Sequence, residues 1–265
     1  MKKILVIGKK SLLSLKIEKY LKNKYYVKRL SFPTIKKNKK ILSKFNFIIN
    51  CTFNKNLSNF KRSSDFILAS YLVNKKITYI MISSCKVYGS NKGYPVSEKK
   101  KCKPITDYGK KKFIIEKKLK KILKNKVLIL RVSNILQFDI RESSNLKTFI
   151  NKMLIHLKNK NKIYIPKNKF LKDFLPIDHF NLALYQLIKN NITGIYNIGS
   201  GVGITIFEFA KLLIKGFGSG DIIKVNESTD NIILSVNKLK KKIDYELSKK
   251  LIKKYIIKLG KKLKY

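Results

Sequence analysis

The feature that most constrains the fold of this chain is the alternation of short apolar runs with amphipathic stretches over its first 134 residues. The apolar runs, each of strand length, cover residues 3–7, 25–30, 45–51, 77–83 and 127–132. Apolar residues at helical spacing occupy the intervals at 12–22, 57–74 and 107–124. Strands that alternate with helices form right-handed βαβ units and a parallel sheet. The sequence therefore predicts an α/β fold with a doubly wound parallel sheet.

The remainder of the chain is less regular. Helical patterns near 145–158, 179–189 and 205–215, and from about residue 246, are separated by short strand-like runs. We expect residues 1–134 to form the sheet domain, with 171–190 returning to it. Residues 135–170 and 191–265 are then expected to form a smaller C-terminal lobe. Ligands of open α/β sheets bind beyond the carboxyl ends of the strands, so the lobe should close over that edge.

The charge of the chain is extreme, with 61 Lys and Arg against 15 Asp and Glu and a formal net charge of +46. Such a charge normally indicates nucleic acid or an anionic membrane as the partner. Only four of the basic residues are Arg, and the 57 Lys are spread over the whole length among Ile, Asn, Phe and Tyr. This pattern favours a composition imposed by an AT-rich genome. Nucleic acid is therefore not the expected partner.

Cysteine usage and hydropathy exclude several other classes. Cys51, Cys85 and Cys102 are odd in number and lack C-x-x-C spacing, which indicates neither a zinc site nor a disulfide framework. No apolar run reaches membrane-spanning length, and residues 1–3 lead directly into a strand-like run instead of a signal peptide. We therefore expect a cytoplasmic protein without membrane insertion.

A possible catalytic site is visible in two neighbouring segments. Ser84 ends the predicted strand at 77–83 and precedes Cys85-Lys86-Val87-Tyr88-Gly89, and Tyr108-x-x-x-Lys112 opens the helix at 107–124. Tyr and Lys four residues apart share one helical face, and a nearby ammonium favours loss of the phenol proton. A Ser at the strand end can hydrogen-bond a carbonyl oxygen. The three side chains together would donate a proton to a ketone that receives a hydride.

This arrangement resembles the active site of the extended short-chain dehydrogenase/reductases, and among them the NAD-dependent epimerase/dehydratase family that modifies nucleotide sugars. Other segments that resemble the family follow in the expected order: Pro95-x-x-Glu98, Leu130-Arg131-x-x-Asn134, Lys172-Asp173-Phe174-x-x-Ile177-Asp178 and Tyr196-Asn197-Ile198-Gly199-Ser200-Gly201. The resemblance covers essentially the whole chain. It implies a Rossmann-like doubly wound parallel sheet with a smaller C-terminal substrate-binding lobe.

The resemblance also implies roles for individual residues. Ser84, Tyr108 and Lys112 are the expected catalytic residues. The expected substrate-binding residues are Ser84, Cys85, Lys86, Asn134 and Lys172, the last replacing the family's Arg that grips the nucleotide diphosphate. Cys85 is interpreted as a small packing residue of this site. It is not interpreted as an acid or base.

The N-terminal turn departs from the family. The family has G-x-x-G-x-x-G, whereas this chain has Gly8-Lys9-Lys10-Ser11-Leu12-Leu13-Ser14. Ser is small enough to be tolerated in this turn, and a helix N-terminus still attracts phosphate. The resemblance then implies a dinucleotide site formed by Gly8, Ser11, Leu12, Leu13, Cys51, Thr52, Tyr108, Lys112 and Val132.

The end of the second predicted strand indicates which dinucleotide binds. The carboxylate that would accept the ribose hydroxyls of NAD is absent, and the chain reads Arg29-Leu30-Ser31 there. A carboxylate repels a 2′-phosphate, whereas Arg29 and Ser31 accommodate one. The sequence therefore predicts NADPH in preference to NAD.

The function predicted from these features is NADPH-dependent reduction of a keto group, at C4, on a nucleotide-activated sugar for a surface polysaccharide. One alternative is a nucleotide-sugar 4-epimerase that keeps NAD bound. An alternative from another class is a non-catalytic relative that binds nucleic acid or protein. Many members of the family form dimers through the helix that bears the catalytic Tyr, so the resemblance implies a homodimer. The expected contact joins the helix at 107–124 to the apolar stripe of the helix at 57–74 (Phe66, Ile67, Ala69 and Leu72).

Overall fold

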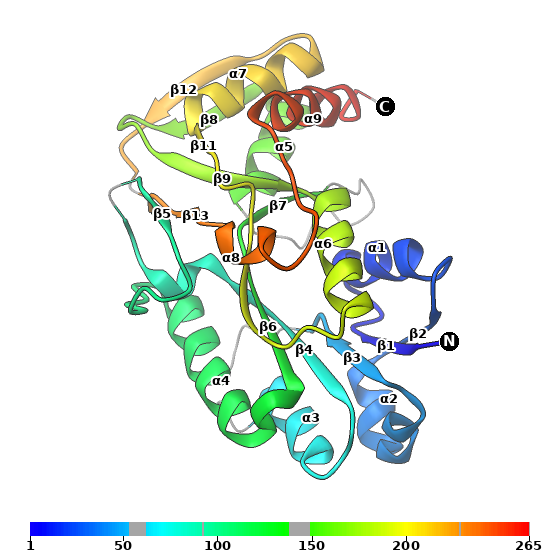
Figure 1. Cartoon of the computed structure of the whole chain (residues 1–265). Helices are drawn as coiled ribbons and strands as arrows, with labels where there is room; N and C mark the ends of the chain where they lie inside the picture. Colours follow the sequence, from blue (N-terminus) through cyan, green and yellow to red (C-terminus); the bar gives the residue numbers. More distant parts are fainter. Residues whose placement is uncertain (53–61, 92, 138–148, 228, 265) are drawn as a thin grey trace.

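The computed structural model describes residues 1–52, 62–91, 93–137, 149–227 and 229–264 (Figure 1). Its centre is a six-stranded sheet in which all neighbouring strands are parallel, in the order β10-β6-β4-β3-β1-β2. The strands are β1 (Lys3–Ile7), β2 (Tyr26–Leu30), β3 (Phe47–Asn50), β4 (Thr78–Ser84), β6 (Val127–Val132) and β10 (Gly194–Ile198). The predicted α/β fold with a doubly wound, Rossmann-like parallel sheet is confirmed.

Helices cover both faces of this sheet, which explains its continuously apolar strands. Along β1, Ile4 and Val6 belong to one hydrophobic cluster, whereas Leu5 and Ile7 belong to another on the opposite face. The helices of the first face are α1 (Leu12–Leu21) and α6 (Ile177–Lys189). Those of the second are α2 (Phe32–Lys37), α3 (Ser64–Leu72) and α4 (Asp107–Leu123), with 3-10 turns at Lys39–Lys44 and Lys124–Lys126.

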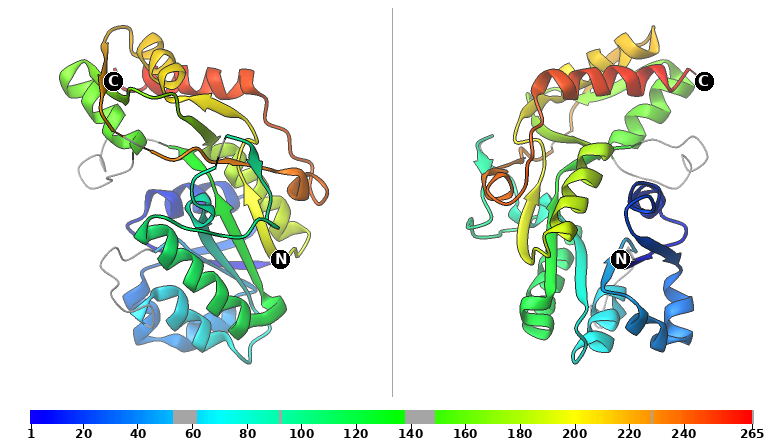
Figure 2. Two further views of the ribbon diagram at one scale, coloured as in Figure 1. Left: turned by 90° about the vertical axis from the view of Figure 1, so that its left-hand side faces the viewer. Right: turned by 45° about the vertical axis from the view of Figure 1, so that its right-hand side comes forward.

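A second part of the molecule, the lobe, lies beyond the carboxyl ends of the strands (Figures 1 and 2). Its strands are β5 (Pro95–Val96), β7 (Asn134–Leu136), β8 (Lys162–Pro166), β9 (Leu171–Pro176), β11 (Gly203–Thr205), β12 (Asp221–Val225) and β13 (Ile233–Leu234). They form small sheets ordered β11-β9-β7, β12-β8 and β13-β5. The lobe helices are α5 (Phe149–Lys160), α7 (Ile206–Phe217), α8 (Asn237–Lys240) and α9 (Lys249–Lys261).

Two glycines bring α7 and α9 into close contact. A Cβ atom at Gly216 would overlap the carbonyl of Ile257, and one at Gly260 would overlap the carbonyl of Leu213. The backbones therefore cross without side chains between them. None of the described helices combines the length and the apolar composition that a membrane crossing needs.

Two elements differ from the sequence prediction. Residues 191–265 were assigned to the lobe, but β10 pairs in parallel with β6 and is an edge strand of the main sheet. The helix predicted at 57–74 begins at Ser64, where the Ser63 hydroxyl accepts a hydrogen bond from the amide of Phe66, and residues 57–61 lie outside the described residues. The assignment of β10 was wrong because its apolar run is too short to indicate which sheet it joins.

Candidate functional site

The predicted catalytic Ser84 is the last residue of β4, at the carboxyl edge of the main sheet. It also begins the 3-10 turn Cys85–Tyr88, labelled η3, in which the Ser84 hydroxyl accepts a 3.2 Å hydrogen bond from the amide of Lys86. This turn directs the chain away from the sheet. Ser84 is consequently held where the sheet meets the lobe.

Helix α4 brings the other two predicted catalytic residues to the same place. Tyr108 lies in its first turn and is 38% exposed, and Lys112 follows one turn later with its ammonium 2.8 Å from the carbonyl oxygen of Ile82 on β4. A Cβ at Gly109 would overlap the carbonyl of Lys86, so the start of α4 touches η3 directly. The first two turns of α4, which carry Tyr108 and Lys112, therefore lie against the end of β4 and the turn after Ser84.

A buried ion pair lies one turn further along α4. The Glu116 carboxylate accepts hydrogen bonds from the Arg131 guanidinium of β6, the shortest at 2.6 Å, and from the hydroxyl of Ser83 at 2.5 Å. All three side chains are buried. Burial opposes the charged form of Arg131, but Glu116 holds the pKa of this guanidinium above its usual value. The network joins α4 to the carboxyl ends of β4 and β6, beneath Ser84.

Other motif residues extend this network into the lobe. The Arg131 guanidinium lies 4.8 Å from the centre of the Tyr88 ring, and the Tyr88 hydroxyl donates a 2.7 Å hydrogen bond to Asn197 on β10. Asn197 in turn donates through its side chain to Val96 and through its amide to the Glu98 carboxylate. These residues therefore hold the sheet and the lobe together. Sequence reasoning recognised them as a signature but assigned them no such role.

The N-terminal turn is closed by hydroxyl groups in place of the missing glycines. Gly8 has φ +125° and packs against the backbone of Cys51. A Cβ atom built on Gly8 would lie 3.3 Å from the carbonyl carbon of Cys51. Ser11 caps α1 by accepting a hydrogen bond from the amide of Ser14. The Ser14 hydroxyl is buried and lies 2.5 Å from the carbonyl oxygen of Gly8. The turn thus keeps a conformation for which Gly is needed at only one position.

The side chains expected at the cofactor's 2′-phosphate both have partners within the protein. Arg29 donates a 2.6 Å hydrogen bond to Glu18 on α1 and another to the carbonyl of Lys9 in the N-terminal turn. The Ser31 hydroxyl caps α2 by accepting a hydrogen bond from the amide of Thr34. Their role toward a 2′-phosphate stays a prediction, because Glu18 competes for the Arg29 guanidinium.

The remaining predicted cofactor residues border the same edge. Leu12 and Leu13 form the first turn of α1, and Val132 ends β6. Cys51 follows β3 beside Gly8, and the Thr52 hydroxyl lies 2.7 Å from Oδ1 of Asn50. The carboxyl ends of β1, β3, β4 and β6 thus place this whole group of residues at one edge of the sheet.

The predicted substrate residues lie where the lobe meets that edge. The Asn134 side chain donates a 2.9 Å hydrogen bond to the carbonyl of Asp173 on β9. Cys85 is buried, and burial raises the pKa of its thiol to about 12, so it supplies no thiolate near neutral pH. Lys172 is also buried and has all three of its N–H groups directed to Thr229 and Asp230. Lys172 therefore has no donor left for a diphosphate unless these contacts break.

Asp230 is a site residue that sequence reasoning missed. Its carboxylate bonds both Lys86 and Lys172. Burial opposes its ionisation, but the two ammonium groups lower the pKa of Asp230. The available signal was weak: Asp230 is one of two acids, with Glu227, in the segment between two short strands, and neither lies in a recognisable motif.

Asp173, next to Lys172, organises the turn that follows β10. Its buried carboxylate accepts hydrogen bonds from the amide and hydroxyl of Ser200 and from the amide of Leu234. A Cβ at Gly199 would overlap this carboxylate, so only Gly fits there. Burial raises the pKa of Asp173. This carboxylate therefore has a structural role: it holds β9 to the turn that follows β10.

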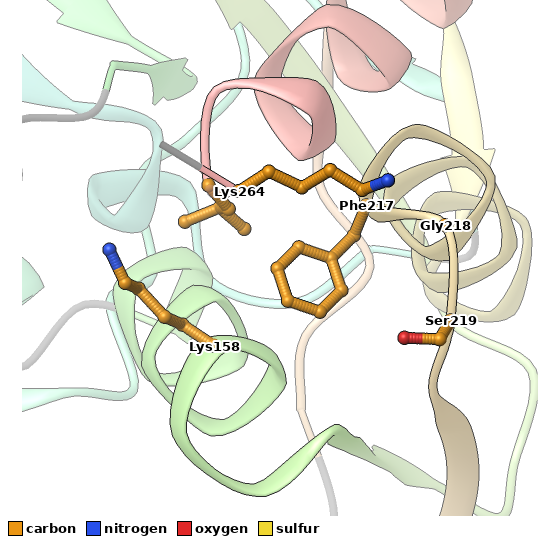
Figure 3. A pocket seen from close by; sticks show the side chains of 6 residues that line it. Lys158, Phe217, Gly218, Ser219 and Lys264 are labelled. Atoms are coloured by element: carbon orange, nitrogen blue, oxygen red, sulfur yellow. The ribbon is translucent and has the colours of Figure 1, made fainter.

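Other features do not compete with this edge as a site. Among the described residues, no three His, Cys, Asp or Glu side chains gather as metal ligands. A surface pocket of about 360 Å³ lies among the ends of α5, α7 and α9, where Lys158, Phe217 and Lys264 border it (Figure 3). It is at the outer end of the lobe, far from the carboxyl ends of the strands (Figure 1).

Comparisons with known proteins identify a family and a shared fold. A family model described as the RmlD substrate binding domain matches residues 2–231. The structure is similar to the UDP-N-acetylglucosamine 4-epimerase from Methanobrevibacter ruminantium M1 in complex with UDP-N-acetylmuramic acid, with 16% identity, TM-score 0.83 and 98% and 97% of the two chains covered. It is also similar to RMD from Pseudomonas aeruginosa complexed with NADPH, with 17% identity, TM-score 0.79 and coverage of 100% and 99%.

A third similar structure is the dTDP-glucose 4,6-dehydratase from Bacillus anthracis in complex with NAD, with 16% identity, TM-score 0.81 and coverage of 99% and 97%. At these identities the likeness shows the fold. The three proteins share one architecture although their names describe an epimerase, a dehydratase and a protein bound to NADPH.

Proposed function

We propose a function from the premise that this chain belongs to the family described as the RmlD substrate binding domain. The function is NADPH-dependent reduction of a keto group, at C4, on a nucleotide-activated sugar. The observation that carries it is the convergence of Ser84, Tyr108 and Lys112 at the carboxyl edge of the sheet. An assembled proton-donating group is what a ketone reductase requires and what a purely binding module does not.

The residues present fit a dinucleotide. Gly8 has φ +125°, which disfavours any residue with a side chain, and a Cβ there would make a tight 3.3 Å contact with the backbone of Cys51. The turn leads into α1, whose N-terminal amides attract phosphate. Gly8, Ser11, Leu12 and Leu13 would hold the pyrophosphate, while Cys51, Thr52 and Val132 would border the rest of the cofactor. The bound cofactor supplies a hydride.

In the proposed mechanism the protein handles the proton and the carbonyl. Ser84 donates a hydrogen bond to the carbonyl oxygen and orients it. As the carbonyl carbon accepts the hydride, Tyr108 transfers its phenolic proton to that oxygen, which completes the alcohol. Lys112 lies one turn after Tyr108, with its ammonium held 2.8 Å from the carbonyl oxygen of Ile82, and its positive charge stabilises the phenolate that forms. The Tyr108 proton is then restored from solvent, which its exposure permits.

The preference for NADPH rests on the missing carboxylate after β2. Residues 29–31 contain no acid, so nothing in this segment repels a 2′-phosphate. The pairing of Arg29 with Glu18 moderates the preference, because the guanidinium is already partly neutralised.

The sharpest test is Tyr108→Phe. The ring is retained, so folding and NADPH binding should be nearly unchanged, while loss of the proton donor should lower kcat by roughly 10²–10⁴ with little change in KM. NADPH oxidation with a panel of 4-keto nucleotide sugars measures this. Cys85→Ala is the control and should retain activity, since a buried thiol with a pKa of about 12 takes no part. Full activity of Tyr108→Phe would refute the proposed proton path.

The alternatives give different results with the unmodified protein. A 4-epimerase would retain NAD through purification and interconvert two nucleotide sugars without net NADPH oxidation. A non-catalytic relative would bind neither NADPH nor NADH. The predicted cytoplasmic location stays a prediction.

The predicted homodimer also stays a prediction, with one correction to its surface. Ala69 and Leu72 of α3 are fully buried within the chain and cannot contact a partner. Phe66 and Ile67 remain partly exposed, and Ile114 of α4 is exposed. A pairing of subunits through these helices would use the latter three residues.

A further inference from the structure

Three charged side chains from distant parts of the sequence meet between the sheet domain and the lobe. Lys86 comes from η3, directly after Ser84, and Lys172 comes from β9. Asp230 lies between β12 and β13, and its two carboxylate oxygens bond the two lysines separately. The cluster thus spans the junction that the proposed substrate would occupy.

Lys172 and Asp230 form a neutral, closed pair. The Lys172 ammonium has three N–H groups, and they bond the Thr229 hydroxyl at 2.7 Å, the Asp230 carbonyl at 2.6 Å and the Asp230 carboxylate. Both side chains are buried, at 5% and 8% exposure. Lys172 therefore has no N–H group left for another partner, and the cluster of two lysines and one carboxylate carries a net positive charge.

The position of Asp230 is fixed by its neighbours. The side-chain oxygen of Asn231 accepts a 2.6 Å hydrogen bond from the amide of Leu171, and its carbonyl accepts a 2.9 Å bond from the amide of Asn91. Ile232 pairs with Lys172 in an isolated bridge. The residues that follow Asp230 are thus held against β9 and Asn91.

Lys86 carries the surplus positive charge of the cluster. Its side chain is 30% exposed, and Asp230 accepts one of its three N–H groups. The other nearby carboxylate, Asp173, is buried and accepts hydrogen bonds from Ser200 and Leu234. Lys86 is therefore the more exposed ammonium of a cluster with a net positive charge, and Asp230 anchors it.

The main chain of Lys86 places this charge beside the catalytic residues. Its amide donates to the Ser84 hydroxyl at 3.2 Å, and its carbonyl touches Gly109, the residue after Tyr108. An anchored ammonium with spare donors is suited to a carboxylate or phosphate oxygen.

We infer that Lys86, anchored by the Lys172–Asp230 pair, binds an anionic oxygen of the substrate beside Ser84. The inference rests on the proposed function, because it places the substrate at this edge. The anion is either a carboxylate on the sugar or the diphosphate that links sugar and nucleotide. Lys172, predicted from the sequence to bind the diphosphate, acts instead as the counter-charge of Asp230.

The test is equilibrium binding, by calorimetry, to the Lys86→Met protein. Each series of probes has three members: a free nucleoside diphosphate, its neutral sugar derivative and its acidic sugar derivative. The first series is UDP, UDP-glucose and UDP-glucuronic acid. The corresponding dTDP or GDP series is used if the unmodified protein prefers another base. Removal of a charge-assisted hydrogen bond should weaken binding about tenfold or more. An equal loss for all probes of a series assigns Lys86 to the diphosphate. A loss confined to the acidic sugar assigns it to a sugar carboxylate.

Two further variants make the result decisive. Lys253→Met removes a lysine of similar exposure whose ammonium lies 2.6 Å from Glu208 in the lobe, and it should leave all affinities unchanged. Lys86→Arg keeps the charge and should recover most of the affinity. Unchanged affinities in a folded Lys86→Met protein would overturn the inference. Such a result would leave the proposed reductase intact, because Tyr108→Phe tests that function through turnover.

Discussion

Two regions at the carboxyl edge of the sheet do the same structural task with different chemistry. Below Ser84, the Glu116–Arg131 pair and Ser83 fix the ends of β4 and β6 through buried charges. At the end of β1, the turn is held by the neutral hydroxyl of Ser14 and by the Arg29–Glu18 pair, whose side chains are 19% and 27% exposed. Removing the partner of a buried charge costs much stability, because the remaining charge is left in the interior without compensation. Removing the partner of a hydroxyl or of a partly exposed ion pair costs much less.

The comparison predicts its largest effect for Glu116→Gln. This change leaves the Arg131 guanidinium buried without a counter-charge, so the free energy of unfolding should fall by about 3–5 kcal/mol. Urea denaturation followed by circular dichroism measures it. The double variant Glu116→Leu/Arg131→Met removes both charges and should be less destabilised than Glu116→Gln. A loss below about 1 kcal/mol for Glu116→Gln would show that the two regions do not differ as described.

A smaller effect is expected for Ser14→Ala in the N-terminal turn. The variant removes a buried hydroxyl and leaves the Gly8 carbonyl without that donor, which should cost about 1–3 kcal/mol of unfolding free energy. Ser70→Ala is the matched control. The Ser70 hydroxyl likewise donates a hydrogen bond to a backbone carbonyl, in this case three residues earlier in its helix, but Ser70 is exposed. The control should change stability by less than about 0.5 kcal/mol. If both variants lost the same free energy of unfolding, burial would not explain the effect of Ser14→Ala.

The smallest effect concerns the partly exposed Arg29–Glu18 pair of the same region. Glu18→Gln frees the Arg29 guanidinium, and an exposed ion pair is worth about 0.2–1 kcal/mol. The ratio of NADPH to NADH affinity should therefore rise, by at most about fivefold, in a fluorescence titration. Glu208→Gln breaks a lobe pair of the same 2.6 Å length and should leave the ratio unchanged. A ratio that falls in Glu18→Gln would show that Arg29 supports the turn and does not meet a 2′-phosphate.

Local pattern was sufficient for the longer elements and for placing the predicted catalytic residues on them. The apolar period distinguished strands from helices, and β1, α1, β6 and α4 begin and end within a residue of the predicted ranges. Ser84 and Tyr108 could be placed together because a strand end and the next helix start must meet at one edge of a parallel sheet. Short elements such as α2 and the sheet membership of β10 were missed, because a few residues carry too little periodicity.

By itself the sequence determined the α/β alternation and the position of Ser84, Tyr108 and Lys112 along the chain. Only the tertiary structure decided which charges meet. Lys86 and Asp230 lie 144 residues apart, and nothing in either segment specifies the other. Glu116 and Arg131 pair for the same reason: burial near the sheet makes each charge depend on whichever opposite charge the chain brings there. Periodicity acts over a few residues, whereas the environment of a charge is set by the closure of the whole fold.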